Sequence, residues 1–142
     1  MDYLLTEEQI MIRDLARQIA VEKIVPVRAE LDEQNKFPRD IMKAIAQADL
    51  YALFIPEEYG GLGKKSLELC ITVEELSKAC VGVATTYASS ALGTYPILLY
   101  GSEEQKKKFL PDVATGKSLV AFGLTEANAG SDASGIQTTA KL

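Results

Sequence analysis

The hydrophobic pattern of this chain changes its period near Gly116, and this change restricts the folds that the chain can adopt. Before Gly116, apolar residues recur three or four positions apart, the spacing of amphipathic helices. After it, "SLVAFGL" is a short apolar run typical of a buried strand, and "GIQTTAKL" alternates apolar and polar residues like a half-buried strand. We therefore predict a mostly α fold: an orthogonal or up-down helical bundle over residues 1–117, followed by the start of a β-domain over 118–142.

The predicted β-domain is too small to be stable alone. Two short strands do not form a stable sheet without further strands or a covering layer. We therefore expect the chain of 142 residues to be the N-terminal piece of a longer protein.

Local signals mark where the predicted helices begin and end. Two capping boxes, Thr6 with Gln9 and Ser102 with Gln105, each predict a helix start. Four further residues break the helical region or begin a new helix: Pro26, Asn35, Pro38 and Ser66. In the helix after Ser66 we predict a buried stripe formed by Leu69, Val73, Leu76 and Cys80.

Charge and hydropathy exclude several classes of partner. The net charge is -5, with 20 acidic against 15 basic residues, and no basic block is typical of a nucleic-acid surface. The N-terminus carries Asp2 where a signal peptide carries bases, and no apolar run approaches the roughly 18 residues of a membrane-spanning helix. We expect a soluble cytoplasmic protein that binds neither nucleic acid nor membranes.

Cysteine and histidine usage limits the chemistry. Cys70 and Cys80 lie ten residues apart in one helical pattern, which places them roughly 15 Å apart, too far for a disulfide. The chain has no histidine, so we expect neither a zinc site nor a histidine-based catalytic triad. Acid–base chemistry here would have to use carboxylates, lysine or tyrosine.

The segment "AFGLTEANAGSDASG" combines a strand end with a run of small residues. Such residues allow a flat or anionic ligand to approach backbone N–H groups, and the hydroxyls of Thr125 and Ser131 add polar contacts. The alternative, which composition alone favours, is a surface loop joining two strands. Its acids are Glu126 and Asp132, and we interpret Glu126 as a structural residue that bonds loop N–H groups or a neighbouring base.

The order of these residues is more informative than their composition. Gly-Leu-Thr-Glu, two residues, Ala-Gly-Ser-Asp, two residues and Gly closely resembles the signature of the acyl-CoA dehydrogenase family. "FIPEEYGGLG" and "GSEEQKKKFLP" are also similar to stretches of that family, and the resemblance covers practically the whole chain. Ala127 departs from it, because many members carry proline there.

The resemblance implies three domains, an N-terminal helical one, a middle β-barrel and a C-terminal helical one that this sequence lacks, with FAD as cofactor. By position, the residues implied to contact the flavin or its pyrophosphate are Phe122, Leu124, Thr125, Gly130 and Ser131. Those implied to contact the acyl-CoA substrate are Ser131, Thr85, Ala88 and Leu92. For the helical residues, plain core packing is the alternative.

The implied reaction removes a proton from Cα of an acyl-CoA and transfers a hydride from Cβ to FAD, giving a trans-2-enoyl-CoA. The resemblance places the glutamate base beyond Leu142, so we expect this fragment alone to be inactive. It further implies a homotetramer, electron-transfer flavoprotein as electron acceptor, and short- or medium-chain substrates in fatty acid β-oxidation. The alternatives are a related flavin-dependent oxidase or monooxygenase, or a non-catalytic helical interaction module.

Overall fold

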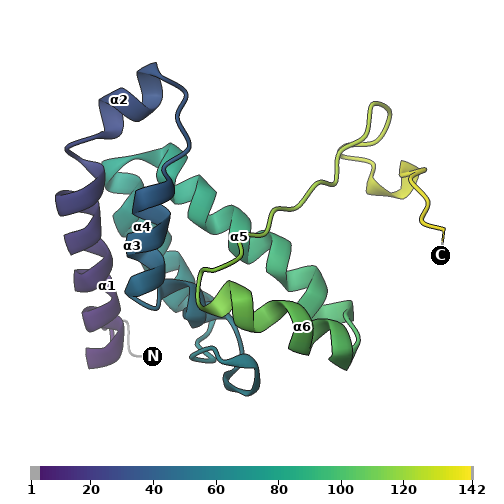
Figure 1. Ribbon diagram of the computed structural model, residues 1–142, viewed down its shortest axis with the longest axis horizontal. Coiled ribbons are helices and arrows are strands. Elements are labelled where there is room, and N and C mark those ends of the chain that lie inside the picture. Colours follow the sequence, from purple (N-terminus) through teal and green to yellow (C-terminus); the bar gives the residue numbers. More distant parts are fainter. Residues whose placement is uncertain (1–3, 142) are drawn as a thin grey trace.

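The computed structural model describes residues 4–141, and most of them form helices (Figure 1). The main helices are α1 (Glu7–Ile19), α2 (Arg28–Glu33), α3 (Arg39–Gln47), α4 (Ser66–Ala79), α5 (Val81–Tyr100) and α6 (Glu103–Ala114). The shorter elements are a π-helix, η1 (Ala20–Ile24), and three 3₁₀ turns: η2 (Leu50–Phe54), η3 (Glu57–Tyr59) and η4 (Ala133–Gly135). The helices form one body, and the chain after α6 crosses α5 and leaves it on one side. The prediction of a mostly α fold is confirmed.

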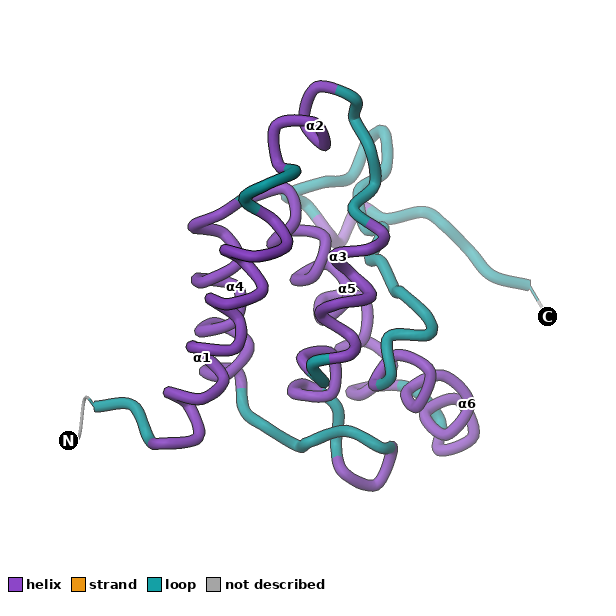
Figure 2. The backbone as a smooth tube through the Cα atoms, turned by 60° about the vertical axis from the view of Figure 1, so that its left-hand side comes forward, coloured by secondary structure: helices purple, strands orange, loops and turns teal. Residues whose placement is uncertain are grey.

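The helical body is organised around α4. This helix packs against α1 on one side and α5 on the other, and α1 and α4 run side by side in both ribbon views (Figure 2). The turn η2 connects the layers, since it contacts α3, α4, α5 and α6.

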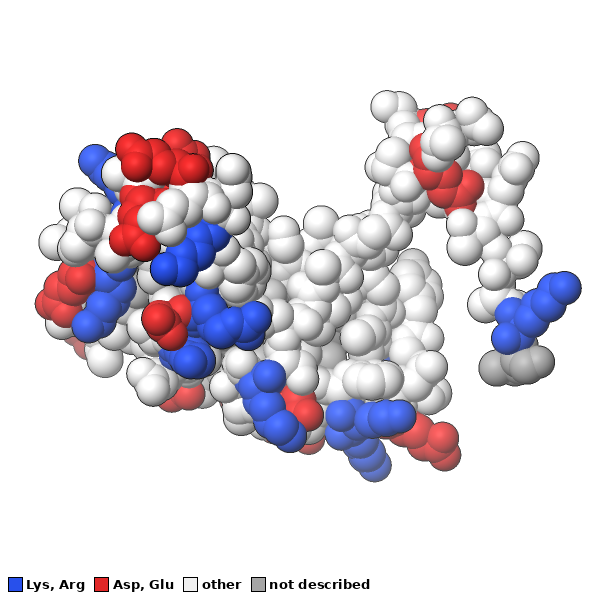
Figure 3. Space-filling view, turned by 45° about the horizontal axis from the view of Figure 1, so that its top comes forward, with Lys and Arg blue, Asp and Glu red and all other residues white. Residues whose placement is uncertain are grey.

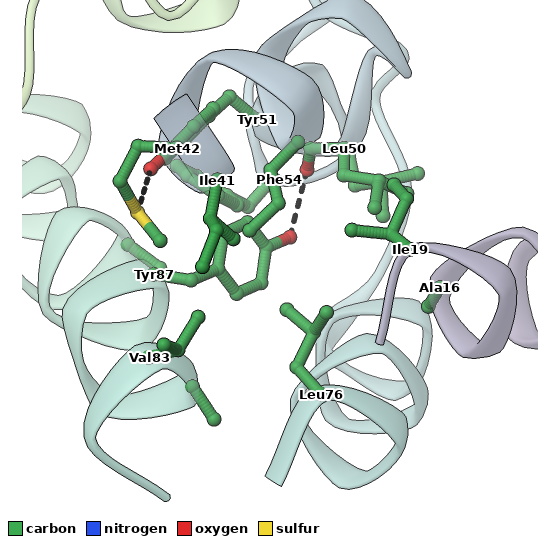
Figure 4. Packing of buried hydrophobic residues seen from close by; sticks show 14 of the residues in the cluster. Ala16, Ile19, Ile41, Met42, Leu50, Tyr51, Phe54, Leu76, Val83 and Tyr87 are labelled. Atoms are coloured by element: carbon green, nitrogen blue, oxygen red, sulfur yellow. Dashed lines mark hydrogen bonds between the residues drawn. The ribbon is translucent and has the colours of Figure 1, made fainter. Parts of the chain in front are cut away.

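The core is centred on three aromatic rings at the junction of η2 and α5 (Figure 4). Tyr51 and Tyr87 lie 5.3 Å apart between ring centroids, and Phe54 packs edge-on against both. The buried Tyr87 hydroxyl donates to the Leu50 carbonyl at 2.7 Å, so its polar group is satisfied inside the core. Loss of solvation raises the pKa of Tyr51 to about 12, which keeps this phenol neutral.

Most of the predicted helix ends are confirmed. The hydroxyls of Thr6 and Ser102 accept the N–H groups of Gln9 and Gln105 at 3.2 and 3.3 Å. The π-helix η1 ends at Ile24, two residues before Pro26, and Asn35 has a φ of 49°, as a turn requires. Pro38 occupies the cap position before α3 instead of its first turn. Ser66 does begin α4, but as its first helical residue and not as its N-cap. The cap is Lys65, whose N–H donates to the Glu68 carboxylate at 3.0 Å.

The buried face of α4 is more polar than predicted. Of the expected stripe only Leu76 is fully buried, while Leu69, Val73 and Cys80 are half-buried. The face toward α1 includes two acids, Glu68 at 8% and Glu75 at 4% exposure.

Partners from α1 make this burial possible. Gln9 donates to the Glu68 carboxylate at 2.8 Å. The Arg17 guanidinium bonds both oxygens of Glu75 at 3.0 and 3.1 Å, and Lys78 adds an ion pair at 2.7 Å. The hydrogen bonds from Arg17, followed by the Lys78 contact, lower the pKa of Glu75 despite its burial. The spacing of hydrophobic residues in the sequence does not predict these polar pairs between two helices.

The segment after α6 differs from its prediction. No strand forms within residues 118–141, and the apolar residues expected inside a sheet are exposed by 37–43%: Leu119, Phe122, Leu124 and Ile136. The two strand predictions were wrong for this structure, because none of the described residues offers these segments a partner strand. Leu142, the last residue of the predicted alternation, lies outside the described residues. The boundary at residue 117 stays a prediction.

Candidate functional site

An apolar groove runs between α4 and α5, with a cavity volume of about 500 Å³. Its lining consists of Leu69, Val73, Ser77, Val81, Ala84, Thr85, Ala88, Ser89, Ala91, Leu92 and Tyr95. The structure therefore brings the predicted substrate residues Thr85, Ala88 and Leu92 together in one cavity. Within residues 4–141, Thr85 and Leu92 are exposed and Ala88 is half-buried. Their role as substrate contacts stays a prediction.

The composition of α5 explains the shape of the groove. Its residues are small over most of the first twelve positions, and Thr85, Ala88 and Leu92 share one face at spacings of three and four. The buried Thr94 hydroxyl is satisfied within the helix, where it donates to the Ser90 carbonyl at 2.6 Å. No charged residue lies on α5, and Figure 3 shows a broad uncharged surface between the charged side of the helical body and the C-terminal segment.

The opposite wall of the groove was missed by the sequence reasoning. Leu69, Val73 and Ser77 project from α4 into the same cavity. Their four-residue spacing was visible in the sequence, but we assigned Leu69 and Val73 to the buried core. A helix stripe shows only which residues share a face, and does not distinguish a core face from a groove wall.

The predicted flavin-contacting residues lie apart from this groove. Phe122, Leu124, Thr125, Gly130 and Ser131 are all exposed in the C-terminal segment, and none of them lines the groove. Within residues 4–141, the backbone N–H groups of 122–125 and the hydroxyls of Thr125 and Ser131 make no hydrogen bond. These groups are therefore free to donate hydrogen bonds to a ligand.

Glu126 holds the loop that follows. Its carboxylate accepts the N–H groups of Gln137 and Thr138, each at 2.9 Å, and also the Thr138 hydroxyl. Its own backbone pairs with Ala129. The bond from the Gln137 N–H, followed by those from Thr138, lowers the pKa of Glu126. The structural role that we expected for this acid is confirmed, so Glu126 is not a free base.

Residues 4–141 contain two cysteines. Cys70 is exposed and Cys80 half-buried, both as free thiols. No group of three or more potential metal ligands occurs in this part of the chain. None of the helices described is long and apolar enough to cross a membrane.

Known proteins are similar to this chain in both sequence and architecture. The chain is 40% identical over 141 residues to the probable acyl-CoA dehydrogenase YngJ of Bacillus subtilis, covering 99% of this chain and 37% of that protein. It is 42% identical over 142 residues to the acryloyl-CoA reductase (NADH) of Anaerotignum propionicum, covering 100% of this chain and 36% of that protein. The chain thus spans little more than a third of the length of these relatives.

Solved structures agree with the sequence relatives. Butyryl-CoA dehydrogenase from Megasphaera elsdenii matches with a TM-score of 0.90 and 37% identity, over 97% of this chain and 37% of that one. An acyl-CoA dehydrogenase from Bacillus anthracis, complexed with FAD, matches with a TM-score of 0.86 and 38% identity, over 94% and 23% of the two chains.

The family itself is shown by the helical body. The sequence model of the family described as "Acyl-CoA dehydrogenase, N-terminal domain" matches residues 6–117, which include every helix from α1 to α6. Together with the relatives above, this match shows that the chain belongs to the acyl-CoA dehydrogenase family.

Proposed function

We propose that this chain supplies the acyl-binding wall and part of the flavin site of an FAD-dependent acyl-CoA dehydrogenase. The whole enzyme would act in the cytoplasm, as a homotetramer, on short- or medium-chain acyl-CoA. The observation that carries the proposal is the groove between α4 and α5, which is apolar, about 500 Å³ in volume and free of charged side chains. An acyl chain gains free energy by leaving water for such a surface. The small side chains of Ala88 and Ala91 leave room for a short or medium chain.

The C-terminal segment supports the cofactor part of the proposal. The N–H groups of 122–125 and the Thr125 hydroxyl would hold the flavin edge, and Gly130 and Ser131 would lie near the pyrophosphate and CoA. When bound, FAD supplies a two-electron acceptor for the hydride that leaves the acyl Cβ. Donors placed at that edge would stabilise the negative charge that develops on reduction.

The residues that line the groove include no candidate for the catalytic base. No carboxylate lines it, although the reaction needs a base at the acyl Cα. Glu68 and Glu75 face α1 and are bonded to Gln9 and Arg17, and Glu126 is bonded to its own loop. We therefore propose that the base is a carboxylate outside this sequence and that residues 1–142 alone are inactive.

A second direction of reaction is favoured by one relative. The acryloyl-CoA reductase of Anaerotignum propionicum, 42% identical, is named for reducing an enoyl thioester with NADH. The same groove could bind an enoyl-CoA, because saturated and unsaturated chains have similar shapes. The electron partner would then set the direction: electron-transfer flavoprotein for oxidation, NADH for reduction.

Anaerobic titration of the complete flavoprotein tests these proposals. Butyryl-CoA and hexanoyl-CoA should bleach the flavin absorbance, whereas palmitoyl-CoA should do so weakly. Reduced protein that is reoxidised by crotonyl-CoA in preference to electron-transfer flavoprotein would favour the reductive direction. Rapid reoxidation by O₂ would identify an oxidase. Absence of flavin from the complete protein would favour the alternative of a non-catalytic helical interaction module.

A further inference from the structure

Gly93 lies at an unusual place, in the interior of α5. Glycine destabilises a helix interior relative to alanine, so its presence needs a separate reason. Backbone conformation is not that reason, because Gly93 is not one of the glycines with positive φ. The reason is steric: a Cβ built at Gly93 would lie 2.8 Å from Val120 Cγ1, 2.9 Å from the Ala121 carbonyl carbon and 3.0 Å from the Ala121 nitrogen. Two of these three atoms belong to the backbone and cannot rotate away.

The contact is the point at which the C-terminal segment crosses α5 (Figure 1). Beside it lies a second cavity, with Thr86, Ser89 and Ser90 of α5 on one side and residues 119–121 on the other. Thr86 and Gly93 are seven residues apart, which puts them on the same helix face. The first predicted flavin-contacting residue, Phe122, follows directly after the crossing.

Two faces of α5 therefore carry the two halves of the proposed site. One face, with Thr85, Ala88 and Leu92, lines the apolar groove. The other face, through Gly93, contacts the backbone immediately before residues 122–125. Leu92 and Gly93 are neighbours in the sequence, so the same helix carries the wall of the acyl groove and contacts the chain just before the predicted flavin-contacting segment.

We infer that Gly93 is a positioning residue: its missing side chain sets how closely the chain at Val120–Ala121 approaches α5, and thereby places the N–H donors of residues 122–125 for FAD. This inference rests on the proposed function and goes beyond it, because Gly93 does not line the groove and is not one of the predicted flavin-contacting residues. A Cβ at this position would displace the segment and misplace the donors.

The test compares two Gly→Ala variants of α5 in the complete flavoprotein. Gly93→Ala should raise the Kd of the apoprotein for FAD by at least about tenfold and shift the visible absorbance and circular dichroism of the bound flavin, because small misplacements of binding groups are costly. Gly82→Ala is the matched control: Gly82 is exposed in the first turn of the same helix, and its added Cβ would meet only Cys80 Sγ, at 3.8 Å. It should leave both the Kd and the spectra unchanged.

A second pair of variants covers the case in which Gly93→Ala fails to fold. Val120→Ala removes the side-chain contact, but the Ala121 backbone stays too close for a Cβ at position 93. Gly93→Ala/Val120→Ala should therefore fold and still bind FAD more weakly than Val120→Ala alone.

The outcomes separate the two proposals. If either Gly93 variant matches its reference in FAD affinity and flavin spectrum, the positioning role is overturned while the proposed function stands. If the wild-type protein and Gly82→Ala both fail to bind FAD, the proposed function itself fails.

Discussion

Phe54 and Phe122 occupy opposite environments in the same chain. Phe54 is 5% exposed in the helical core, whereas Phe122 is 43% exposed in the segment after α6. A helix satisfies its backbone hydrogen bonds internally and needs cover on one face only, while a strand needs a neighbour for both its backbone and its side chains. The helical body can therefore pack on itself, and the segment that carries the predicted cofactor contacts depends on surroundings that residues 4–141 do not supply.

The largest effect should come from truncating matched leucines in the two regions. Leu76→Ala removes a fully buried side chain from α4 and should lower the free energy of unfolding by about 2–5 kcal/mol. Leu124→Ala, at a residue 42% exposed, should change it by less than about 0.5 kcal/mol. Urea unfolding followed by circular dichroism measures both. Equal losses at the two sites would mean that the segment packs as tightly as the core.

Acid should weaken the contact between α1 and α4. The pKa of Glu75 is lowered from 4.5 in the folded state, so its stabilising contribution is present above that pH and is lost as the pH falls through the lowered value. Glu75→Gln should cost about 1–2 kcal/mol near pH 7, because Arg17 and Lys78 lose their buried partner, and less near pH 3, as the pH falls toward the lowered pKa.

Glu74→Gln is the control for this measurement, since Glu74 is exposed and, within residues 4–141, its carboxylate pairs only with Lys78. Its effect should be close to zero at both pH values. If Glu75→Gln lowered the free energy of unfolding by the same amount at pH 3 as at pH 7, the side chain would act through its shape and not through its charge.

A smaller effect is expected at the start of α6. Ser102→Ala removes the hydroxyl that accepts the Gln105 N–H and should destabilise the helical body by about 1 kcal/mol. Ser118→Ala, beyond the end of α6, changes an exposed hydroxyl and serves as the reference. Thermal unfolding compares the two, and equal midpoints would show that the capping box contributes nothing.

The smallest effect on global stability is expected at Glu126. Glu126→Gln weakens the bonds to the N–H groups of Gln137 and Thr138 without touching the helical core. Amide hydrogen exchange at these two positions should accelerate, while exchange of the Gly116 amide, bonded to Val113 in the α6 C-cap, should not change. Unchanged exchange at Gln137 and Thr138 would show that the Glu126 carboxylate does not hold this loop.

Features encoded by neighbouring residues could be predicted from the sequence. The capping boxes at Thr6 and Ser102 need only residues three positions apart, and the shared face of Thr85, Ala88 and Leu92 needs only the helical repeat. The acyl-CoA dehydrogenase family could be named because the order of residues around Thr125 is specific.

Features that depend on distant partners could not be predicted. Glu68 and Glu75 are buried because Gln9 and Arg17 lie across from them, 59 and 58 residues away. The "SLVAFGL" strand was predicted from its own composition, but a strand forms only against a neighbour. Gly93 looked unremarkable because its close contact, Val120, lies on another segment.

The central claim, that the α4–α5 groove holds the acyl chain, is tested most directly by filling it. Ala88→Phe in the complete flavoprotein should lower kcat/KM for octanoyl-CoA by about 10–200-fold relative to its effect on butyryl-CoA. A hydrophobic pocket discriminates between substrates that differ by one methylene group by about this factor. Ala29→Phe, at an exposed alanine of α2, should not alter the chain-length profile, and flavin content should be equal in both variants. A profile that is unchanged in Ala88→Phe would contradict the account, because the acyl chain would then bind elsewhere.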